Sequence, residues 1–100
     1  MLESTIEKYF KASVRAHGGD TMKFVSPGRR NVPDQLVTWP ARHPVHIAQL
    51  PPVTDFAEIK APGKKPRPGQ LREHARLRAL GYTVVVIDSK ESVDNYVRNK

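Results

Sequence analysis

The sequence predicts a single α/β domain in which helices flank a mixed β-sheet, with elements in the order α-β-β-β-α-β-α. Two observations predict this class. The segment 82–87 is continuously apolar and follows a helix-like segment, which is typical of a strand–helix–strand crossover with parallel strands. Further upstream, two segments rich in strand formers are separated by turn formers. One hundred residues is the length of one compact domain, so we expect residues 1–100 to form one unit.

Three segments have the pattern of a helix. In the first, 3–16, apolar residues recur every four residues and two glycines follow. These apolar residues are Ile6, Phe10 and Val14. The second segment, 70–80, has a helical composition and is followed by a glycine. Either Asp88 or Ser89 can cap a third helix at the end of the chain.

Four segments are predicted to be strands: 21–25, 34–39, 55–60 and 82–87. The last two flank the second helix and should be parallel neighbours, with 82–87 buried on both faces of the sheet. Between the second and third strands, the proline-rich stretch 40–54 is compatible with a hairpin-like excursion or with an irregular loop.

The composition favours a polyanionic partner. The chain has 17 basic and 10 acidic residues, a net charge of +7 and a pI near 10.1, which suits a nucleic acid but also occurs on solvated surfaces. With no cysteine, disulfides, thiolate metal sites and cysteine nucleophiles are excluded. No apolar run approaches the ~20 residues that span a bilayer, so we expect a soluble, cytoplasmic protein.

Two carboxylates are placed where they can share a cation. Asp34 opens one predicted strand and Glu58 lies near the end of another, and neighbouring strands are only ~4.8 Å apart. Hard cations that assist phosphodiester hydrolysis take such oxygen ligands. Because side chains alternate along a strand, Glu58 and Lys60 share one face while Ile59 points to the core. Lys60 can then hold the attacking water or the phosphate.

A Glu-x-Lys pair on one strand is also common as a simple surface ion pair. The surroundings favour the catalytic interpretation here. The pair lies in an otherwise apolar strand and precedes a Pro/Gly-rich loop with basic residues, and a second basic loop precedes Asp34. A phosphate backbone can dock on these loops. Their basic residues are Arg29, Arg30, Lys64, Lys65 and Arg67.

The second predicted helix places Gln70, His74 and Leu77 on one stripe, which faces the sheet if Leu77 is in the core. Gln70 then points toward the end of the strand with Lys60, where it either contacts the site or is a plain helix-end residue in solvent. His74 is interpreted as a partly buried, hydrogen-bonded histidine rather than a metal ligand, because no second histidine shares its face at metal spacing.

The same residues carry a resemblance to a known family. They are Glu3-x-x-Ile6, then Val32-Pro33-Asp34 after a Ser-Pro-Gly-Arg-Arg loop, then Glu58-Ile59-Lys60 and Pro68-Gly69-Gln70. In this order they resemble the virus-type replication-repair nuclease (VRR-NUC) domains, a branch of the restriction-endonuclease-like PD-(D/E)xK superfamily. The resemblance covers nearly the whole chain, and the length is similar to that of the short phage and prophage members.

The resemblance implies a Mg²⁺- or Mn²⁺-dependent DNA endonuclease. Asp34, Glu58 and the backbone carbonyl of Ile59 would bind the metal, and Lys60 would be the catalytic lysine. Glu3 would be the helix acid near the metal and Gln70 the motif glutamine. Stand-alone members look like homodimers that cut branched DNA such as Holliday junctions, in phage or bacterial replication, recombination or repair.

Two points stay open at this level. The family usually has Gly-x-Pro-Asp where this chain has Asn31-Val32-Pro33-Asp34, although asparagine tolerates a positive φ better than most residues. Glu7 lies one helical turn after Glu3, so either acid can face the metal.

A non-catalytic basic DNA-binding protein of the same fold is the main alternative function. A third alternative, a structural or partner-binding phage protein, explains the positive net charge poorly.

Overall fold

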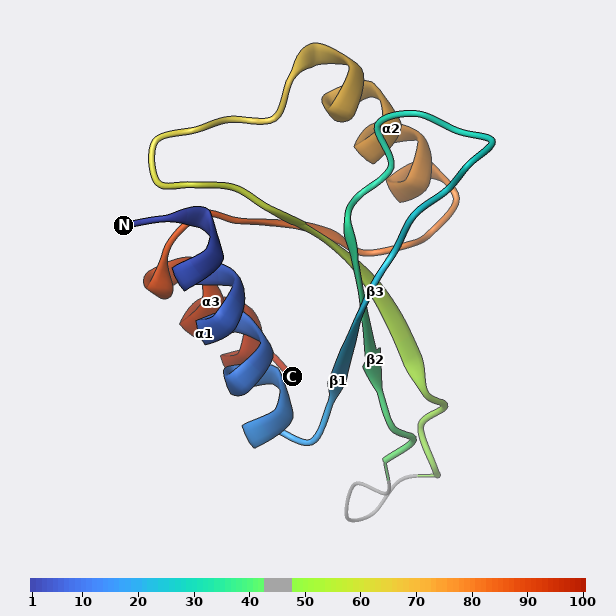
Figure 1. The fold of residues 1–100 in the computed structure, drawn as a ribbon. Helices are drawn as coiled ribbons and strands as arrows, with labels where there is room; N and C mark the ends of the chain where they lie inside the picture. Colours follow the sequence, from blue (N-terminus) through green and yellow to red (C-terminus); the bar gives the residue numbers. More distant parts are fainter. Residues whose placement is uncertain (43–47) are drawn as a thin grey trace.

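The computed structural model describes residues 1–42 and 48–100, and the predicted element order is confirmed (Figure 1). The elements are α1 (Glu3–Ala16), β1 (Asp20–Lys23), β2 (Gln35–Trp39), β3 (Val53–Ile59), α2 (Pro68–Ala79), β4 (Val84–Ile87) and α3 (Lys90–Arg98). Of the two candidate caps for the last helix, Ser89 is the one used, since its Oγ accepts a hydrogen bond from the backbone N–H of Ser92 at 3.0 Å.

The four strands form one mixed sheet in the order β1-β2-β3-β4. The first three pair antiparallel, and β3 and β4 pair in parallel through the α2 crossover, as predicted. In this register Gln35 lies opposite Ala57 and Glu58 lies opposite Val86. The start of β2 and the end of β3 therefore meet at the same end of the sheet.

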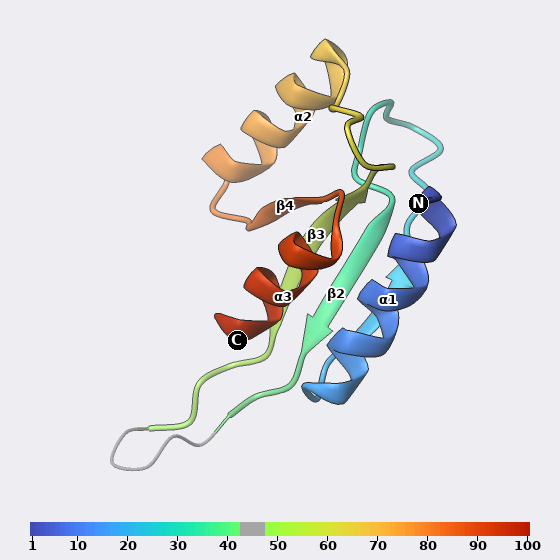
Figure 2. The ribbon, with the colours of Figure 1, turned by 90° about the vertical axis from the view of Figure 1, so that its left-hand side faces the viewer.

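The core lies between the sheet and the two helices α1 and α3, which pack side by side on one face (Figure 2). The predicted stripe of Ile6, Phe10 and Val14 is fully buried there. A polar network ties α3 to the sheet, because the Tyr96 hydroxyl donates to Asp55 at 2.5 Å and accepts from the Trp39 ring N–H at 2.9 Å. The helix α2 stands apart, above the end of the sheet where β3 finishes (Figure 1).

The prediction that 82–87 is buried on both faces is wrong. The strand β4 spans only 84–87 and is an edge strand, so Val85 and Val86 are half-buried while Val84 and Ile87 are buried. Its apolar composition satisfied the pattern of a central strand, but an edge strand has a sheet neighbour on one side only. The other strands also shift by one to two residues at their ends, as fraying elements do.

The proline-rich stretch 40–54 is hairpin-like at its base. Arg42 and Leu50 exchange two backbone hydrogen bonds of 3.0 and 2.7 Å in an antiparallel bridge. The rest of the excursion, residues 43–47, lies outside the described residues, and His43 and His46 fall within it. Among the helices that the structure describes, none is long and apolar enough to cross a membrane.

Candidate active site

Asp34 is fixed at the start of β2 by a contact with the neighbouring strand. Its Oδ1 accepts a hydrogen bond from the backbone N–H of Ile59, at 3.2 Å. Pro33 directly before it is fully buried, which anchors the chain where it enters the strand. Burial raises the pKa of the half-buried Asp34 carboxyl, the Ile59 N–H lowers it, and the charges of Glu7 and Glu3 raise it further. Asp34 is therefore partly desolvated and lies within electrostatic reach of two acids of α1.

At this end of the sheet, Glu58 is the carboxyl whose pKa is shifted most. It is only 5% exposed, and burial together with the charge of Asp34 raises its pKa to about 7. Lys60 opposes this shift and lowers the pKa, which places its ammonium within electrostatic reach of the Glu58 carboxylate. Ile59 between them is 2% exposed and belongs to the core, as the alternation along the strand predicts.

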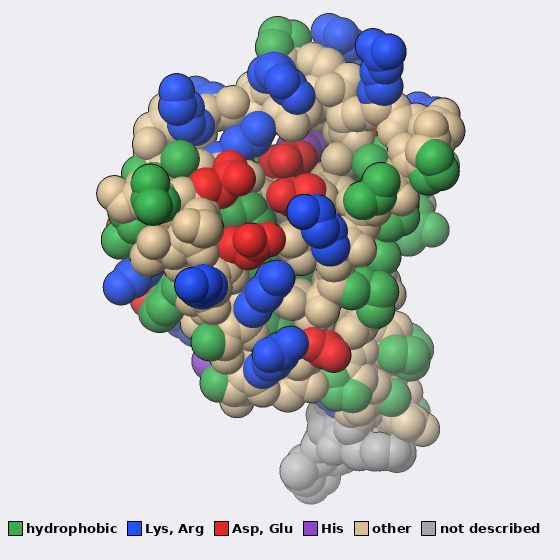
Figure 3. All heavy atoms as spheres, in the orientation of Figure 1, with side chains coloured by type: hydrophobic (Ala, Val, Ile, Leu, Met, Phe, Trp, Pro, Cys, Tyr) green, Lys and Arg blue, Asp and Glu red, His purple; other side chains and the backbone are tan. Residues whose placement is uncertain are grey.

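The acids of α1 complete an acidic cluster, which we define as Glu3, Glu7, Asp34 and Glu58. Figure 3 shows acidic side chains gathered between the start of α1 and the sheet, with Lys and Arg side chains around them. Glu7 accepts a hydrogen bond from the Gln35 amide at 2.7 Å. Glu3 is exposed and raises the pKa of both Asp34 and Glu58, whereas Glu7 acts on Asp34. Both candidate helix acids thus face the site.

The donor set at this site fits a hard divalent cation. The Glu58 carboxylate has a buried oxygen, Oε1, without a hydrogen-bond partner in the described part of the chain, so the carboxylate is not already committed to another group. Carboxylate oxygens are the ligands that Mg²⁺ and Mn²⁺ prefer. Burial, and after it the charges of neighbouring acids, raise both carboxyl pKa values, and a bound cation would stabilise the ionised form against both effects. Within residues 1–42 and 48–100, no three acidic or imidazole groups converge closely enough to hold a metal alone. Backbone carbonyl and water oxygens would therefore have to complete the coordination shell.

The predicted second helix faces the sheet with the expected stripe. Gln70, His74 and Leu77 are all at least nine-tenths buried. Gln70 serves as part of a capping box, because its Oε1 accepts the backbone N–H of Arg67 at 2.8 Å. It is therefore not a solvent-exposed helix-end residue, and its role in the site stays a prediction.

Asn31 adopts a positive φ of 65°, so it takes the left-handed conformation that the family's glycine would otherwise supply. The turn before Asp34 therefore survives the departure from the family pattern. This turn also packs on α2, because a Cβ added to Gly69 would lie 2.7 Å from Asn31 Nδ2. A side chain at position 69 would push the turn away from the helix.

Comparison with known proteins agrees with this geometry. A solved structure described as a VRR_NUC domain aligns with a TM-score of 0.77 and 36% sequence identity, over 96% of this chain and 94% of that one. This chain belongs to the VRR-NUC family. The protein named "Putative nuclease p44" of Acyrthosiphon pisum secondary endosymbiont phage 1 is 52% identical over 89 residues, which are 89% of this chain and 85% of that protein. A scan against family models gave no match.

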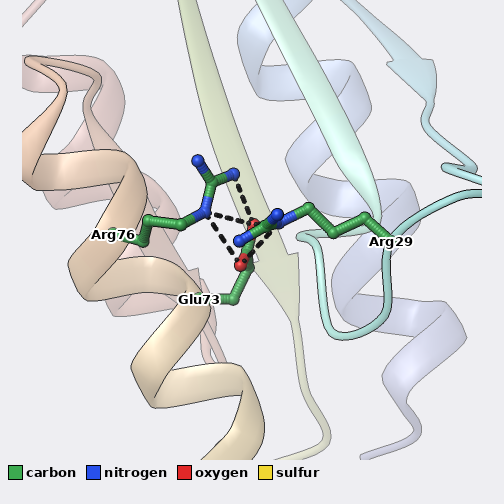
Figure 4. A network of polar contacts seen from close by, with 3 residues as sticks. All are labelled: Arg29, Glu73 and Arg76. Carbon is green, nitrogen blue, oxygen red and sulfur yellow. Dashed lines mark hydrogen bonds and ion pairs between the residues drawn. The ribbon is translucent and has the colours of Figure 1, made fainter.

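The basic residues of this VRR-NUC domain fall into two groups. Arg29 is engaged, because its Nε donates to both carboxylate oxygens of Glu73 at 2.9 and 2.8 Å, and Arg76 contacts the same carboxylate (Figure 4). These two guanidinium groups lower the pKa of Glu73 to about 2. The other four basic residues predicted to bind DNA are exposed. They are Arg30, Lys64, Lys65 and Arg67.

Glu73 and Gln35 are among the buried polar residues of this VRR-NUC domain that sequence reasoning missed. Glu73 lies three residues after Gln70 on the stripe that was predicted to face the sheet, so the helical period already indicated its burial. Gln35 is fully buried at the start of β2 and holds Glu7. A polar residue on the core side of an apolar strand was the available signal for Gln35.

Proposed function

We propose that this protein is a metal-dependent endonuclease that hydrolyses DNA phosphodiester bonds. The observation that carries the proposal is the pair of carboxylates where β2 begins and β3 ends. The Asp34 carboxylate is held by the Ile59 N–H and lies close enough to Glu58 to raise the pKa of the Glu58 carboxyl. The Lys60 ammonium also acts on Glu58 and lowers that pKa. Membership of the VRR-NUC family and similarity to a protein named as a phage nuclease support the same chemistry.

Asp34, Glu58 and the backbone carbonyl of Ile59 would hold Mg²⁺ or Mn²⁺. When bound, such a cation stabilises charge on phosphate oxygens and lowers the pKa of water in its shell. The protein itself supplies the fixed orientation of the ligands, since a buried strand end and a backbone hydrogen bond leave Asp34 little freedom. Glu3 or Glu7 would be the acid of α1 near the metal, since the charges of both raise the pKa of Asp34.

Lys60 would stabilise the negative charge that develops on the phosphate. An ammonium beside a carboxylate cluster donates hydrogen bonds only, so it can orient water or phosphate but cannot bind the cation. The exposed residues Arg30, Lys64, Lys65 and Arg67 would hold the phosphate backbone of DNA, to which their loops are open. Arg29 would contribute less, because its guanidinium is already bound to Glu73.

The DNA structure and the assembly are inferred from the family resemblance. We propose branched DNA such as four-way junctions as the substrate, and a homodimer, because two sites related by a two-fold axis match a two-fold junction. The setting would be the cytoplasm of a bacterial or phage-infected cell, where such DNA arises during replication, recombination or repair.

The test is to incubate the purified protein with fluorescent junction, flap and duplex DNA in Mg²⁺, Mn²⁺ or EDTA. The proposal predicts cutting in the presence of a divalent cation and none in EDTA. If DNA is bound tightly but never cut in any of these cations, the chain is a basic DNA-binding protein that keeps a nuclease fold.

A further inference from the structure

His74 lies against the carboxylate of Glu58 in the interior of the protein. Its side chain is fully buried, and its Nε2 is 3.5 Å from Glu58 Oε1, whose side chain is 6% exposed. Within the described ranges, neither imidazole nitrogen has a hydrogen-bond partner, and Glu58 Oε1 has none either. A buried ring nitrogen and a buried carboxylate oxygen, neither of them hydrogen-bonded, therefore face each other at the outer limit of hydrogen-bonding distance.

The position of His74 is set by the rest of α2. Gln70 caps the first turn of the helix, and Glu73 is bound to Arg29 in the loop that leads to Asp34. These contacts hold the helix over the sheet with one orientation about its axis, so the His74 ring points at the end of β3. The ring is thus aimed at Glu58 by contacts that involve neither residue.

We propose that His74 is a positioning residue for Glu58, donating a hydrogen bond from Nε2–H to Oε1. The contact fixes the rotation of the carboxylate and leaves its second oxygen for the cation. Carboxylates that bind metals are commonly oriented by such hydrogen bonds, and their loss typically weakens metal affinity by about 10- to 100-fold. This inference rests on the proposed function, in which Glu58 is a metal ligand.

The chemistry of the ring makes the proposal specific. A neutral imidazole has one donor and one acceptor nitrogen, so only the tautomer with hydrogen on Nε2 can donate to Glu58. If His74 merely fills space, either tautomer serves equally well, and an apolar side chain of similar size replaces it.

Three variants and one measurement on the wild type test the role. Glutamine carries an amide nitrogen at nearly the reach of Nε2, asparagine stops one atom earlier, and leucine has no donor. We expect Mn²⁺ affinity, measured by calorimetry without DNA, to fall at least about 10-fold in His74→Leu and His74→Asn and to stay within about 3-fold in His74→Gln. Nitrogen-15 NMR of the metal-free wild type should show hydrogen on Nε2 of His74.

The outcomes separate this role from the proposed function. Wild-type affinity in His74→Leu, an equal loss in all three variants, or hydrogen on Nδ1 would overturn the positioning role while the nuclease function stands. A wild type that binds no Mn²⁺ would overturn both. If His74→Leu does not fold, the contrast between His74→Gln and His74→Asn and the NMR result still decide.

Discussion

Ile59 donates its backbone N–H to the carboxylate of Asp34 across two adjacent strands, at 3.2 Å. The residue that carries this N–H lies between Glu58 and Lys60 in sequence, so a single hydrogen bond sets Asp34 relative to the whole Glu58-Ile59-Lys60 segment. Because Ile59 is itself fixed in the core, the site inherits the rigidity of the sheet. Changes in the candidate site should therefore affect chemistry more than folding.

Replacing Lys60 with alanine should slow cleavage and leave metal binding intact. An ammonium that stabilises phosphate charge contributes in the transition state, and its loss typically costs on the order of 100-fold or more in rate. Removing a positive charge beside Asp34 and Glu58 should leave Mn²⁺ affinity equal or higher. Single-turnover cleavage and calorimetric Mn²⁺ titration measure the two effects separately.

The matched control for this change is Lys8→Ala, which removes an exposed lysine from α1. If Lys60 were only a surface partner of Glu58, its loss would change stability by less than ~1 kcal/mol and leave the rate near that of the control. That result would remove Lys60 from the mechanism.

The stability of the metal-free protein should fall as pH rises from about 4.5 to 7. The pKa of Glu58 is about 7 in the folded protein and near 4.5 in the unfolded chain, so the folded state holds this proton more tightly. The stabilisation by protonated Glu58 is complete below the unfolded value and is lost as pH rises through the folded value, with a span of at most about 3 kcal/mol.

Urea unfolding at several pH values, in wild type and in Glu58→Gln, measures this dependence. Glutamine mimics the protonated side chain, so the variant should lose most of the decline between pH 5 and 8. Parallel curves for the two proteins would show that Glu58 ionises normally and that its environment is wetter than the structure indicates.

Glu73→Gln should destabilise the protein and should weaken the hold of α2 on the loop before Asp34. Glu73 is buried and bound to Arg29 and Arg76, and hydrogen bonds to charged groups contribute about 1.5–3 kcal/mol each, less where the arginines are half-exposed. We expect a loss on the order of 1–2 kcal/mol by urea unfolding. Glu91→Gln, on the exposed start of α3, is the control and should change little.

DNA affinity should fall steeply with salt, and the slope should identify the docking residues. Each phosphate contact contributes about −0.9 to the log–log slope, so Lys64→Ala and Lys65→Ala should each make it shallower by about that amount. Arg29→Ala should change the slope less than either lysine variant, because the Arg29 guanidinium is already bound to Glu73. Fluorescence anisotropy at salt concentrations from about 50 to about 300 mM, a range that includes physiological ionic strength, measures the slope for each variant. Equal slopes in all variants would place the DNA elsewhere.

The sequence was sufficient for the order of elements, because that order depends on local patterns. Asp34 and Glu58 could share a site only if their strands were neighbours, and β2 and β3 do pair. Alternation put Glu58 and Lys60 on one face and Ile59 in the core, and the crossover rule made β3 and β4 parallel. The edge position of β4 was not predictable in this way, since an apolar run does not reveal whether a further strand pairs beyond it.

Contacts between distant segments were also beyond the sequence. Arg29 pairs with Glu73, which lies 44 positions away in the sequence. The sequence alone therefore did not distinguish Arg29 from the other basic loop residues predicted to bind DNA. His74 was expected to be partly buried and hydrogen-bonded, but it is fully buried, and neither ring nitrogen has a hydrogen-bond partner among the residues that the structure describes. Its contact with Glu58 depends on how α2 crosses the end of the sheet, which the sequence does not show. The site residues themselves, Asp34, Glu58 and Lys60, stay predictions until their variants are assayed.

The most direct test of the account is single-turnover cleavage of a four-way junction by wild type, Asp34→Ala, Glu58→Ala and Asp20→Ala in Mn²⁺. Asp20 is an exposed acid on β1 and serves as the control for removing one carboxylate. If Asp34 and Glu58 hold the cation, Asp34→Ala and Glu58→Ala stay folded and bind the junction but do not cut it, while Asp20→Ala cuts at the wild-type rate. Near-normal cutting by Asp34→Ala or Glu58→Ala would contradict the account.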